Sequence, residues 1–279
     1  MLLRNKVDHL LNPSMGEIWC LHRVVPVRSI YPSNRELEIT PSYLEQLIKD
    51  HLARGGSFVS LDAIVSDVVS GSFCILKKKQ VNISFDDGFH DIYEQAFPIF
   101  KKFNVPFTIY LTVGFPLGMA DIWWVQLEQL VNGDVDLYER IMRDVRNSDM
   151  NMRDLMHEKT SSVPDLEMCR DLSLSWDQLK EMIDSGLCAI GSHTMTHPCL
   201  TRISKEDVLW ELYESKRIIQ DYLRVNVRHF SYPHSMGNDM VISALRKTGY
   251  ETAALGYGGK LRKNDSVFRL SRKYILQES

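Results

Sequence analysis

Residues 81–88 read Val-Asn-Ile-Ser-Phe-Asp-Asp-Gly, a short apolar run that ends in two adjacent carboxylates and a glycine. A run of this length bounded by a turn signal is typical of a buried strand. Asp86 and Asp87 therefore fall where the strand ends, and Gly88 permits a tight turn there. Aspartates before glycine are also common in turns without a chemical role, so this stretch alone leaves the function open.

Apolar runs of this kind recur along the chain, separated by longer helix-like stretches. This alternation is typical of repeated strand–helix units around a mostly parallel sheet. The expected strands are 18–21, 58–61, 81–85, 107–111, 187–190, 227–231 and 252–255. The expected helices are 41–54, 92–103, 176–185, 205–223 and 240–248, with Thr40 and Ser204 as N-caps. We therefore expect an α/β barrel, in which the carboxyl ends of the strands meet on one face.

The chain has the size and composition of one globular domain. It has 279 residues, of which 44% are hydrophobic and 25% charged, and no linker or repeat divides it. We expect residues 1–279 to form a single domain. The segment 121–174 interrupts the alternation of strands and helices, and its sequence predicts a helical insertion. This insertion could be a lid, a substrate wall or an oligomer contact. Its Trp123-Trp124 pair fits either the core of the insertion or a platform for a sugar ring.

Charge and the first residues exclude several classes of protein. The formal net charge is −3 and no basic stripe with interleaved aromatics is present, so nucleic acid is not an expected partner. The N-terminus has no apolar stretch long enough for a signal peptide or a membrane span, which predicts a cytoplasmic protein. The cysteines form no CxxC pair and are expected to be reduced: Cys20, Cys74, Cys169, Cys188 and Cys199. The oligomeric state is not predicted.

A second motif, Ser192-His193-Thr194-Met195-Thr196-His197-Pro198, sets two histidines four residues apart after another apolar run. Two histidines at this spacing share one side if the segment turns helically, as in other metal sites. Two surface histidines on a loop are the alternative. One aspartate with two histidines is a recurring ligand set for a divalent metal that keeps open positions. The neighbouring aspartate would be free to take a proton from water, which predicts a metal-assisted hydrolase.

Other polar residues follow the remaining strands. His22 comes after the strand 18–21, and Tyr232-Pro233-His234 comes after the strand 227–231. A barrel would bring them to the same face as the two motifs. Taken singly, His22 is more typical of a structural hydrogen-bond donor, and His90 is a candidate for a supporting contact to the aspartates.

Together these residues resemble the NodB-homology polysaccharide deacetylases of carbohydrate esterase family 4, from about Ile18 to the C-terminus. The resemblance implies a distorted (β/α)7-type barrel. Ser84-Phe85-Asp86-Asp87-Gly88 resembles the first family motif, which implies that Asp86 is the base and Asp87 a metal ligand. The motif that begins at Ser192 resembles the second, which implies that His193 and His197 complete the ligand set.

The chain departs from the family pattern at two later motifs. The third family motif reads Arg-x-Pro-Tyr, whereas Ser231-Tyr232-Pro233-His234 keeps only the proline, so Asp86 has no assigned arginine. The backbone N–H of His234 can still act as an oxyanion donor. The C-terminal region reads Phe268-Arg269-Leu270-Ser271-Arg272 and lacks the final Leu-x-His. Leu21-His22-Arg23-Val24 resembles instead an N-terminal element of the subgroup that deacetylates poly-N-acetylglucosamine, which implies His22 as the general acid.

The resemblance thus implies a metal-dependent hydrolase that removes the N-acetyl group from an N-acetylated sugar or polysaccharide and releases acetate. One divalent ion is expected, zinc first, although iron, cobalt, nickel and manganese suit the same ligands. Two alternatives stay open. One is a metal-dependent hydrolase of other non-peptide C–N amides on the same fold, and the other is a catalytically silent glycan-binding module. The sequence does not identify the sugar.

Overall fold

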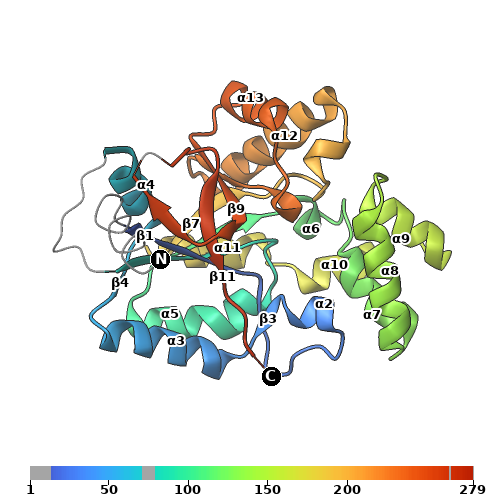
Figure 1. The fold of residues 1–279 in the computed structure, drawn as a ribbon, viewed down its shortest axis with the longest axis horizontal. Coiled ribbons are helices and arrows are strands. Elements are labelled where there is room, and N and C mark those ends of the chain that lie inside the picture. Colours follow the sequence, from blue (N-terminus) through green and yellow to red (C-terminus); the bar gives the residue numbers. More distant parts are fainter. Residues whose placement is uncertain (1–13, 71–78, 264, 279) are drawn as a thin grey trace, which may run out of the picture.

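The computed structural model describes residues 14–70, 79–263 and 265–278 (Figure 1). Seven parallel strands within these residues close into a barrel, which confirms the predicted (β/α)7-type architecture. Around the ring the order is β1, β5, β6, β7, β8, β9 and β11, and β1 pairs with both β11 and β5 to close it. The strands are β1 (Ser14–Leu21), β5 (Gln80–Phe85), β6 (Phe107–Leu111), β7 (Cys188–Ser192), β8 (His229–Ser231), β9 (Thr252–Gly258) and β11 (Leu270–Tyr274).

The set of barrel strands differs from the prediction at one member. The predicted strand 58–61 is wrong as a barrel strand, because only β4 (Ser57–Phe58) is extended there and Leu61 begins helix α4 (Leu61–Ser70). β4 extends the sheet beside β5, and β10 (Lys260–Arg262) runs antiparallel to β1. The strand that completes the ring is β11, whose sequence Leu-Ser-Arg-Lys-Tyr is not an apolar run.

Helices surround the barrel close to their predicted ranges (Figure 1). The predicted helix 92–103 is a π-helical turn, η1 (Ile92–Ala96), followed by α5 (Phe97–Phe103). Thr40 and Ser204 act as the expected N-caps, since each side chain accepts a hydrogen bond from the backbone N–H three residues on. The other helices of this layer are α3 (Pro41–Ala53), α11 (Trp176–Asp184), α12 (Lys205–Leu223) and α13 (Asp239–Lys247).

Alternate residues of each barrel strand face opposite sides of the sheet. One set, which includes Phe85, Phe107 and Phe230, packs under the surrounding helices in the largest apolar core. The other set includes Ile18 and Tyr110, which form a separate core with residues of α4. Asp62 of α4 accepts hydrogen bonds from Arg228 and His229 where β8 begins, so α4 lies near the N-terminal end of the barrel. The predicted site residues follow the strands at the opposite, carboxyl end of the barrel.

Segment 121–174, between β6 and β7, is helical as predicted. It contains α7 (Trp123–Val131), α8 (Val135–Asn147), α9 (Met152–Thr160) and α10 (Leu166–Leu172), and α7, α8 and α9 gather at one side of the barrel in Figure 1. These helices share an apolar core to which Trp123 and Trp124 both belong. The description of 121–174 as an insertion in one domain 1–279 stays a prediction.

Short elements complete the described chain: β2 (Arg23–Val24), α2 (Pro32–Arg35), β3 (Glu38–Ile39), α6 (Gly114–Leu117), η2 (Leu200–Arg202) and η3 (Pro233–Ser235). Four cysteines are free and buried as expected, and Cys74 lies outside the described residues. No helix in the part of the chain described above is both long and apolar enough to cross a membrane.

Candidate metal centre

The carboxyl ends of the barrel strands bring the predicted site residues to one face. β1 and β5 pair in register with Leu21 beside Phe85, so the next residues, His22 and Asp86, leave the barrel at the same height. A pocket of about 370 Å³ opens here. All six predicted site residues line it: His22, Asp86, Asp87, His193, His197 and His234.

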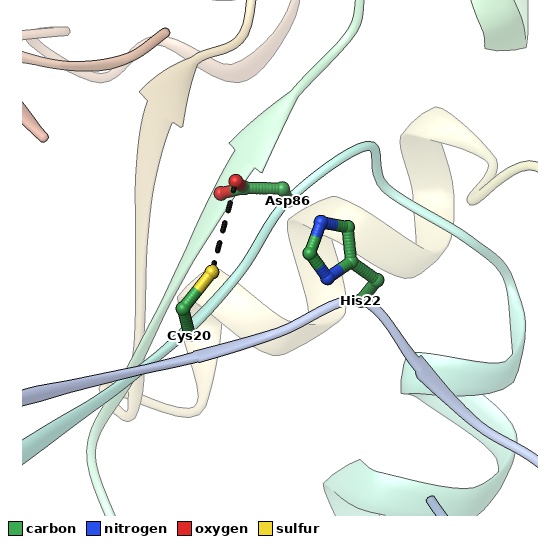
Figure 2. A group of neighbouring side chains, drawn as sticks. All are labelled: Cys20, His22 and Asp86. Atoms are coloured by element: carbon green, nitrogen blue, oxygen red, sulfur yellow. Dashed lines mark hydrogen bonds between the residues drawn. The ribbon is translucent and has the colours of Figure 1, made fainter. Parts of the chain in front are cut away.

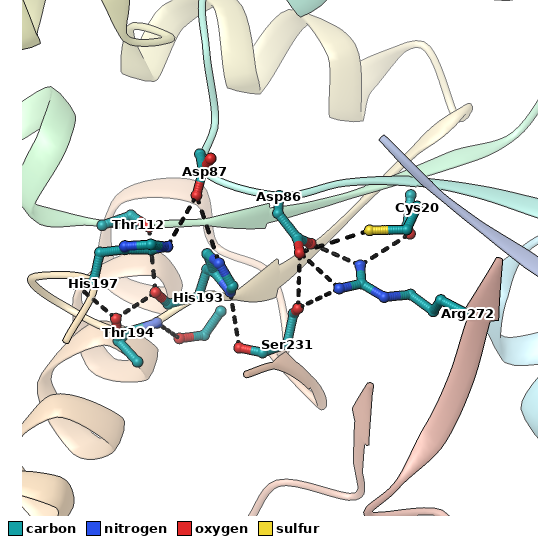
Figure 3. A network of polar contacts seen from close by, with 11 residues as sticks. Cys20, Asp86, Asp87, Thr112, His193, Thr194, His197, Ser231 and Arg272 are labelled. Carbon is teal, nitrogen blue, oxygen red and sulfur yellow. Dashed lines mark hydrogen bonds and ion pairs between the residues drawn. The ribbon is translucent and has the colours of Figure 1, made fainter. Parts of the chain in front are cut away.

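Asp87, His193 and His197 face one another in this pocket (Figure 3). Their ligand atoms all lie within 4.8 Å of one another, and the two histidine Nε2 atoms lie 3.5 and 3.3 Å from Asp87 Oδ1. That carboxylate oxygen is buried and has no hydrogen-bond donor of good geometry. Because buried polar atoms normally have partners, an acceptor faced by two imidazole nitrogens fits a divalent ion held by two nitrogens and one oxygen.

The protonation of His193 also suits a ligand role. Its Nδ1 lies 2.8 Å from the carbonyl oxygen of Ser231, so this nitrogen carries the proton and donates it. The other nitrogen, Nε2, then keeps a lone pair toward Asp87 and a metal. Burial lowers the pKa of His193 to about 4, so the ring is neutral at neutral pH.

The segment that carries both histidines is an irregular loop, so the two side chains do not come together through a helical turn. Thr194 and His197 adopt left-handed backbone conformations, with φ of 75° and 59°, and Asp87 does so with φ of 72°. Such conformations cost roughly 1–3 kcal/mol in residues other than glycine and cluster at functional sites. The two histidines therefore converge because the loop reverses direction, and the surrounding contacts must hold it in that form.

Glu211 of α12 provides those contacts to the loop. One carboxylate oxygen accepts the backbone N–H groups of Met195 at 2.7 Å and Thr196 at 2.9 Å. The other oxygen accepts the hydroxyl of Thr196. Glu211 is buried, and burial raises the pKa of its carboxyl group. This one side chain therefore satisfies two backbone N–H groups and one hydroxyl of the loop.

Asp86 lies beside the metal ligands and is bound by Arg272 of β11 (Figure 3). The guanidinium donates from Nη1 to Oδ1 at 2.7 Å and from Nη2 to Oδ2 at 2.6 Å, and Ser231 Oγ donates to Oδ2 at 3.1 Å. Burial alone would raise the pKa of Asp86, but the charge and hydrogen bonds of Arg272 hold it well below its usual range. Asp86 is therefore an ionised carboxylate with both oxygens fixed in position.

Arg272 is the functional residue that the sequence analysis missed. The motif around Pro233 lacks an arginine, and the guanidinium comes instead from β11, a strand that was not predicted. A signal was available, since Arg272 follows Leu270 at the spacing that puts both on one face of a strand. The side chain of Arg272 is completely buried, and a buried cation requires a charged partner such as Asp86.

His22 and Cys20 approach Asp86 from the end of β1 (Figure 2). Cys20 Sγ lies 4.0 Å from Asp86 Oδ2, and Cys20, His22 and Asp86 form a second cluster of potential metal ligands. This cluster suits an ion poorly, because Arg272 occupies both Asp86 oxygens and burial raises the pKa of the Cys20 thiol. Burial lowers the pKa of His22, whose Nδ1 has no partner, so His22 is neutral next to the ionised Asp86.

The remaining predicted residues form the wall of the pocket. His234 has a left-handed backbone with φ of 55°, and its ring lies 4.7 Å from that of His197. The ring of Trp124 also packs against His197, with the two ring centroids 5.1 Å apart. Trp123 and Trp124 are each 5% exposed and also line the pocket, so they serve as helix core and as pocket wall at once. His90 binds the carbonyl oxygen of Leu172 and does not line the pocket.

Comparison with known proteins matches this arrangement to one family. The profile described as polysaccharide deacetylase matches residues 75–253. A putative polysaccharide deacetylase of Bacillus subtilis, YxkH, is 23% identical over 195 residues, which are 70% of this chain and 51% of that protein. The poly-beta-1,6-N-acetyl-D-glucosamine N-deacetylase of Staphylococcus aureus is 22% identical over 244 residues, 84% of this chain and 65% of that protein. The chain thus spans about half to two thirds of the length of these relatives.

Solved structures share the fold. The Streptococcus pyogenes deacetylase PplD, in complex with acetate, superimposes with a TM-score of 0.68 at 20% identity, covering 94% of this chain and 92% of that one. IcaB from Ammonifex degensii gives a TM-score of 0.65 at 21% identity with the same coverage. At these identities the likeness establishes the barrel architecture.

Proposed function

The chain belongs to the polysaccharide deacetylase family, and from that premise we propose that it is a metal-dependent N-deacetylase of an N-acetylated sugar or polysaccharide. One observation carries the proposal. A single pocket contains a ligand set of one aspartate and two histidines and, beside it, an ionised carboxylate fixed by a buried arginine. The reaction consumes water and yields acetate and a free amino sugar.

We propose that Asp87, His193 and His197 hold one divalent ion, with zinc as the first candidate. Iron, cobalt, nickel and manganese accept the same ligands. When bound, such an ion supplies Lewis-acid polarisation of the acetyl carbonyl and lowers the pKa of a water molecule. Glu211 and the Ser231 carbonyl keep the two histidines in the required positions and tautomer.

Asp86 is the proposed base, and it takes a proton from the attacking water. Arg272 and Ser231 fix the two carboxylate oxygens, so the proton acceptor is aligned before the substrate arrives. The same contacts lower the basicity of Asp86, because they stabilise its ionised form. Positioning therefore contributes more than basicity to its role.

His22 is the proposed acid, and it delivers a proton to the amine nitrogen as the C–N bond breaks. Because burial keeps His22 neutral in the free pocket, it must gain that proton during the reaction. The proton that Asp86 removes from water is a nearby source, since ligand atoms of His22 and Asp86 lie within 4.8 Å. The backbone N–H of His234 is the proposed donor to the oxyanion.

The silent binding module is the weaker alternative. A third motif without its arginine would fit such a module, but Arg272 supplies a guanidinium to Asp86 from another strand. No specific observation favours a hydrolase of non-sugar amides. The cytoplasmic location and the subgroup with an N-terminal histidine stay predictions.

Acetate release from N-acetylated oligosaccharides, compared with peptide amides, tests the proposal. We expect release from the sugars only, and Asp86→Asn should lower the rate about 10²–10⁴-fold, as loss of a general base does, with unchanged metal content. Asp91→Asn is the matched control, because Asp91 is a buried aspartate paired with Arg23 at 2.8 Å and does not line the pocket.

Two outcomes would contradict this account. An unchanged rate in Asp86→Asn would remove Asp86 from the base role. If the wild-type protein binds glycan and each of the five metals but releases no acetate, the chain is a binding module.

A further inference from the structure

The pocket continues past the metal ligands into a part that the proposed chemistry does not use. Residues of the helical segment, of α2 and of η2 line this part, and we call Arg146, Arg202, Trp124 and Asn34 the outer subsite. Arg146 lies in the last turn of α8, and Arg202 ends η2 in the chain that follows β7. The outer subsite therefore joins the helical segment 121–174 to the barrel loop that continues from His197.

Arg202 contacts the backbone of Arg146, and no ion pair with a carboxylate holds either arginine among the described residues. Arg202 Nη2 donates to the carbonyl oxygen of Arg146 at 3.2 Å, which ties the two residues together. In the part of the chain that the structure describes, neither guanidinium has a carboxylate within 4.0 Å. The only carboxylates among the described lining residues are Asp86, which is bound by Arg272, and Asp87, which faces the two histidines. Arg146, whose side chain is exposed, and Arg202, which is half-buried, thus add two positive charges to the pocket that no carboxylate of the described residues pairs with.

Three buried polar atoms of the outer subsite have no hydrogen-bond partner: Arg202 Nη1, Trp124 Nε1 and Asn34 Oδ1. Asn34 is 4% exposed and Trp124 5%, so two of the three atoms belong to deeply buried side chains of the pocket wall, whereas the Arg202 residue is half-buried. An unpaired buried polar group costs about 1–3 kcal/mol, which a ligand that pairs with it recovers. Two of the three atoms are donors, so the missing ligand is rich in acceptors.

We propose that the outer subsite binds an oxyanion, either a phosphate or a carboxylate, that the substrate carries close to its N-acetyl group. Arginine pairs bind both groups well because the planar guanidinium matches two oxygens at once. The proposal rests on the proposed function for the position of the acetamide, which lies at Asp87 and the two histidines. It makes the substrate an anionic glycan rather than a neutral one.

Binding to the zinc-loaded full chain tests this inference by calorimetry with three monosaccharides. The ligands are methyl N-acetylglucosaminide, which is neutral, N-acetylglucosamine 1-phosphate, and N-acetylmuramic acid, which carries a carboxylate. We expect at least one charged sugar to bind ten-fold or more tightly than the neutral sugar at low salt. The preference should shrink as salt rises, because the attraction is between charges. The charged sugar that binds tightly identifies the phosphate or the carboxylate as the natural group.

Matched arginine variants separate the outer subsite from binding at the metal. Arg202→Gln and Arg146→Gln should each remove most of the charge preference, while zinc content and the affinity for the neutral sugar stay unchanged. Arg143→Gln is the control, because Arg143 is exposed on the same helix and does not line the pocket. Equal affinities for charged and neutral sugars, no measurable binding of the charged sugars, or a preference that survives both variants would overturn the inference. Since affinity and acetate release are separate readouts, a protein that prefers the charged sugar but releases no acetate would contradict the proposed function alone.

Discussion

Removal of the Arg272 guanidinium would leave the Asp86 carboxylate inside the barrel with Ser231 Oγ and the more distant Cys20 thiol as its side-chain donors among the described residues. At the scale of single residues this ion pair is the contact on which the site depends most, because the Arg272 side chain is fully buried and that of Asp86 is only 5% exposed. The pair fixes the proposed base, and its arginine lies on a strand far along the sequence from the aspartate. Chemistry and stability of the barrel therefore depend on the same two side chains.

We predict that Arg272→Met lowers the free energy of unfolding by about 3–5 kcal/mol, because it leaves a buried charge without its partner. Acetate release should fall at least 100-fold in the same variant, because Asp86 loses its alignment. Urea unfolding and an acetate assay measure the two effects. Arg269→Met, which removes an exposed arginine three residues earlier, should change stability by less than about 0.5 kcal/mol.

A double variant separates the two roles of the pair. Asp86→Leu combined with Arg272→Met leaves no unpaired charge, so we expect most of the stability to return while acetate release stays absent. A double variant as unstable as Arg272→Met alone would show that the instability has another cause.

At the scale of elements, the site depends on how the loop after β7 is supported by α12. The loop contains two residues with left-handed backbone, and Glu211 accepts its backbone N–H groups. The loop positions His197 relative to His193, so its support should be measurable as metal affinity. Contacts of this kind behind metal ligands typically contribute 10- to 100-fold in affinity.

We predict that Glu211→Gln weakens zinc binding about 10- to 100-fold, because the amide has one acceptor oxygen where the carboxylate has two. Competition with a chromophoric chelator measures the affinity without reference to turnover. Glu206→Gln is the control, since Glu206 is exposed in the first turn of the same helix. Equal zinc affinity in both variants would mean that the loop holds its shape without Glu211.

The elements also explain what the sequence predicted and what it did not. Six barrel strands were predicted because each contains an apolar run that packs under helices on its outer face. β11 was missed because its inward residue Arg272 and its neighbour Lys273 make the strand charged, and Arg272 is compatible with the interior only through Asp86. The metal ligands were predicted from motifs, but the shape of the loop between His193 and His197 was not, because left-handed residues leave no periodic pattern. Arg272 could not be identified as the partner of Asp86, because the two residues meet only when the ring of strands closes, and no local sequence pattern reveals that closure.

At the scale of the whole molecule, four histidines that are buried or half-buried make the stability of the metal-free protein depend on pH. Burial lowers the pKa of each: His22, His193, His229 and His234. In the unfolded chain a histidine titrates near pH 6.5, so below that pH the unfolded state binds protons that the folded state does not. The contribution of the neutral histidines to the free energy of unfolding is therefore complete above about pH 6.5. It is lost as the pH falls from there toward the pKa values of the folded protein, which for His193 is about 4.

We predict that the chelated protein loses roughly 1 kcal/mol per histidine for each pH unit below 6.5, until the folded groups begin to titrate. Urea unfolding at pH 8, 6.5 and 5.5 measures the loss. The variant His234→Gln should show a weaker dependence, since one of the four groups is gone. Identical unfolding free energies at pH 8 and 5.5 would contradict the assignment of neutral buried histidines.

The most direct measurement of the central claim is acetate release by chelated protein before and after zinc is returned. We predict no release without metal, recovery that is complete at one ion per chain, and no recovery in His197→Gln, which lacks one of the three ligands. If the chelated protein releases acetate at the rate of the zinc-loaded protein, Asp87, His193 and His197 do not hold a catalytic metal, and the account of the site is wrong.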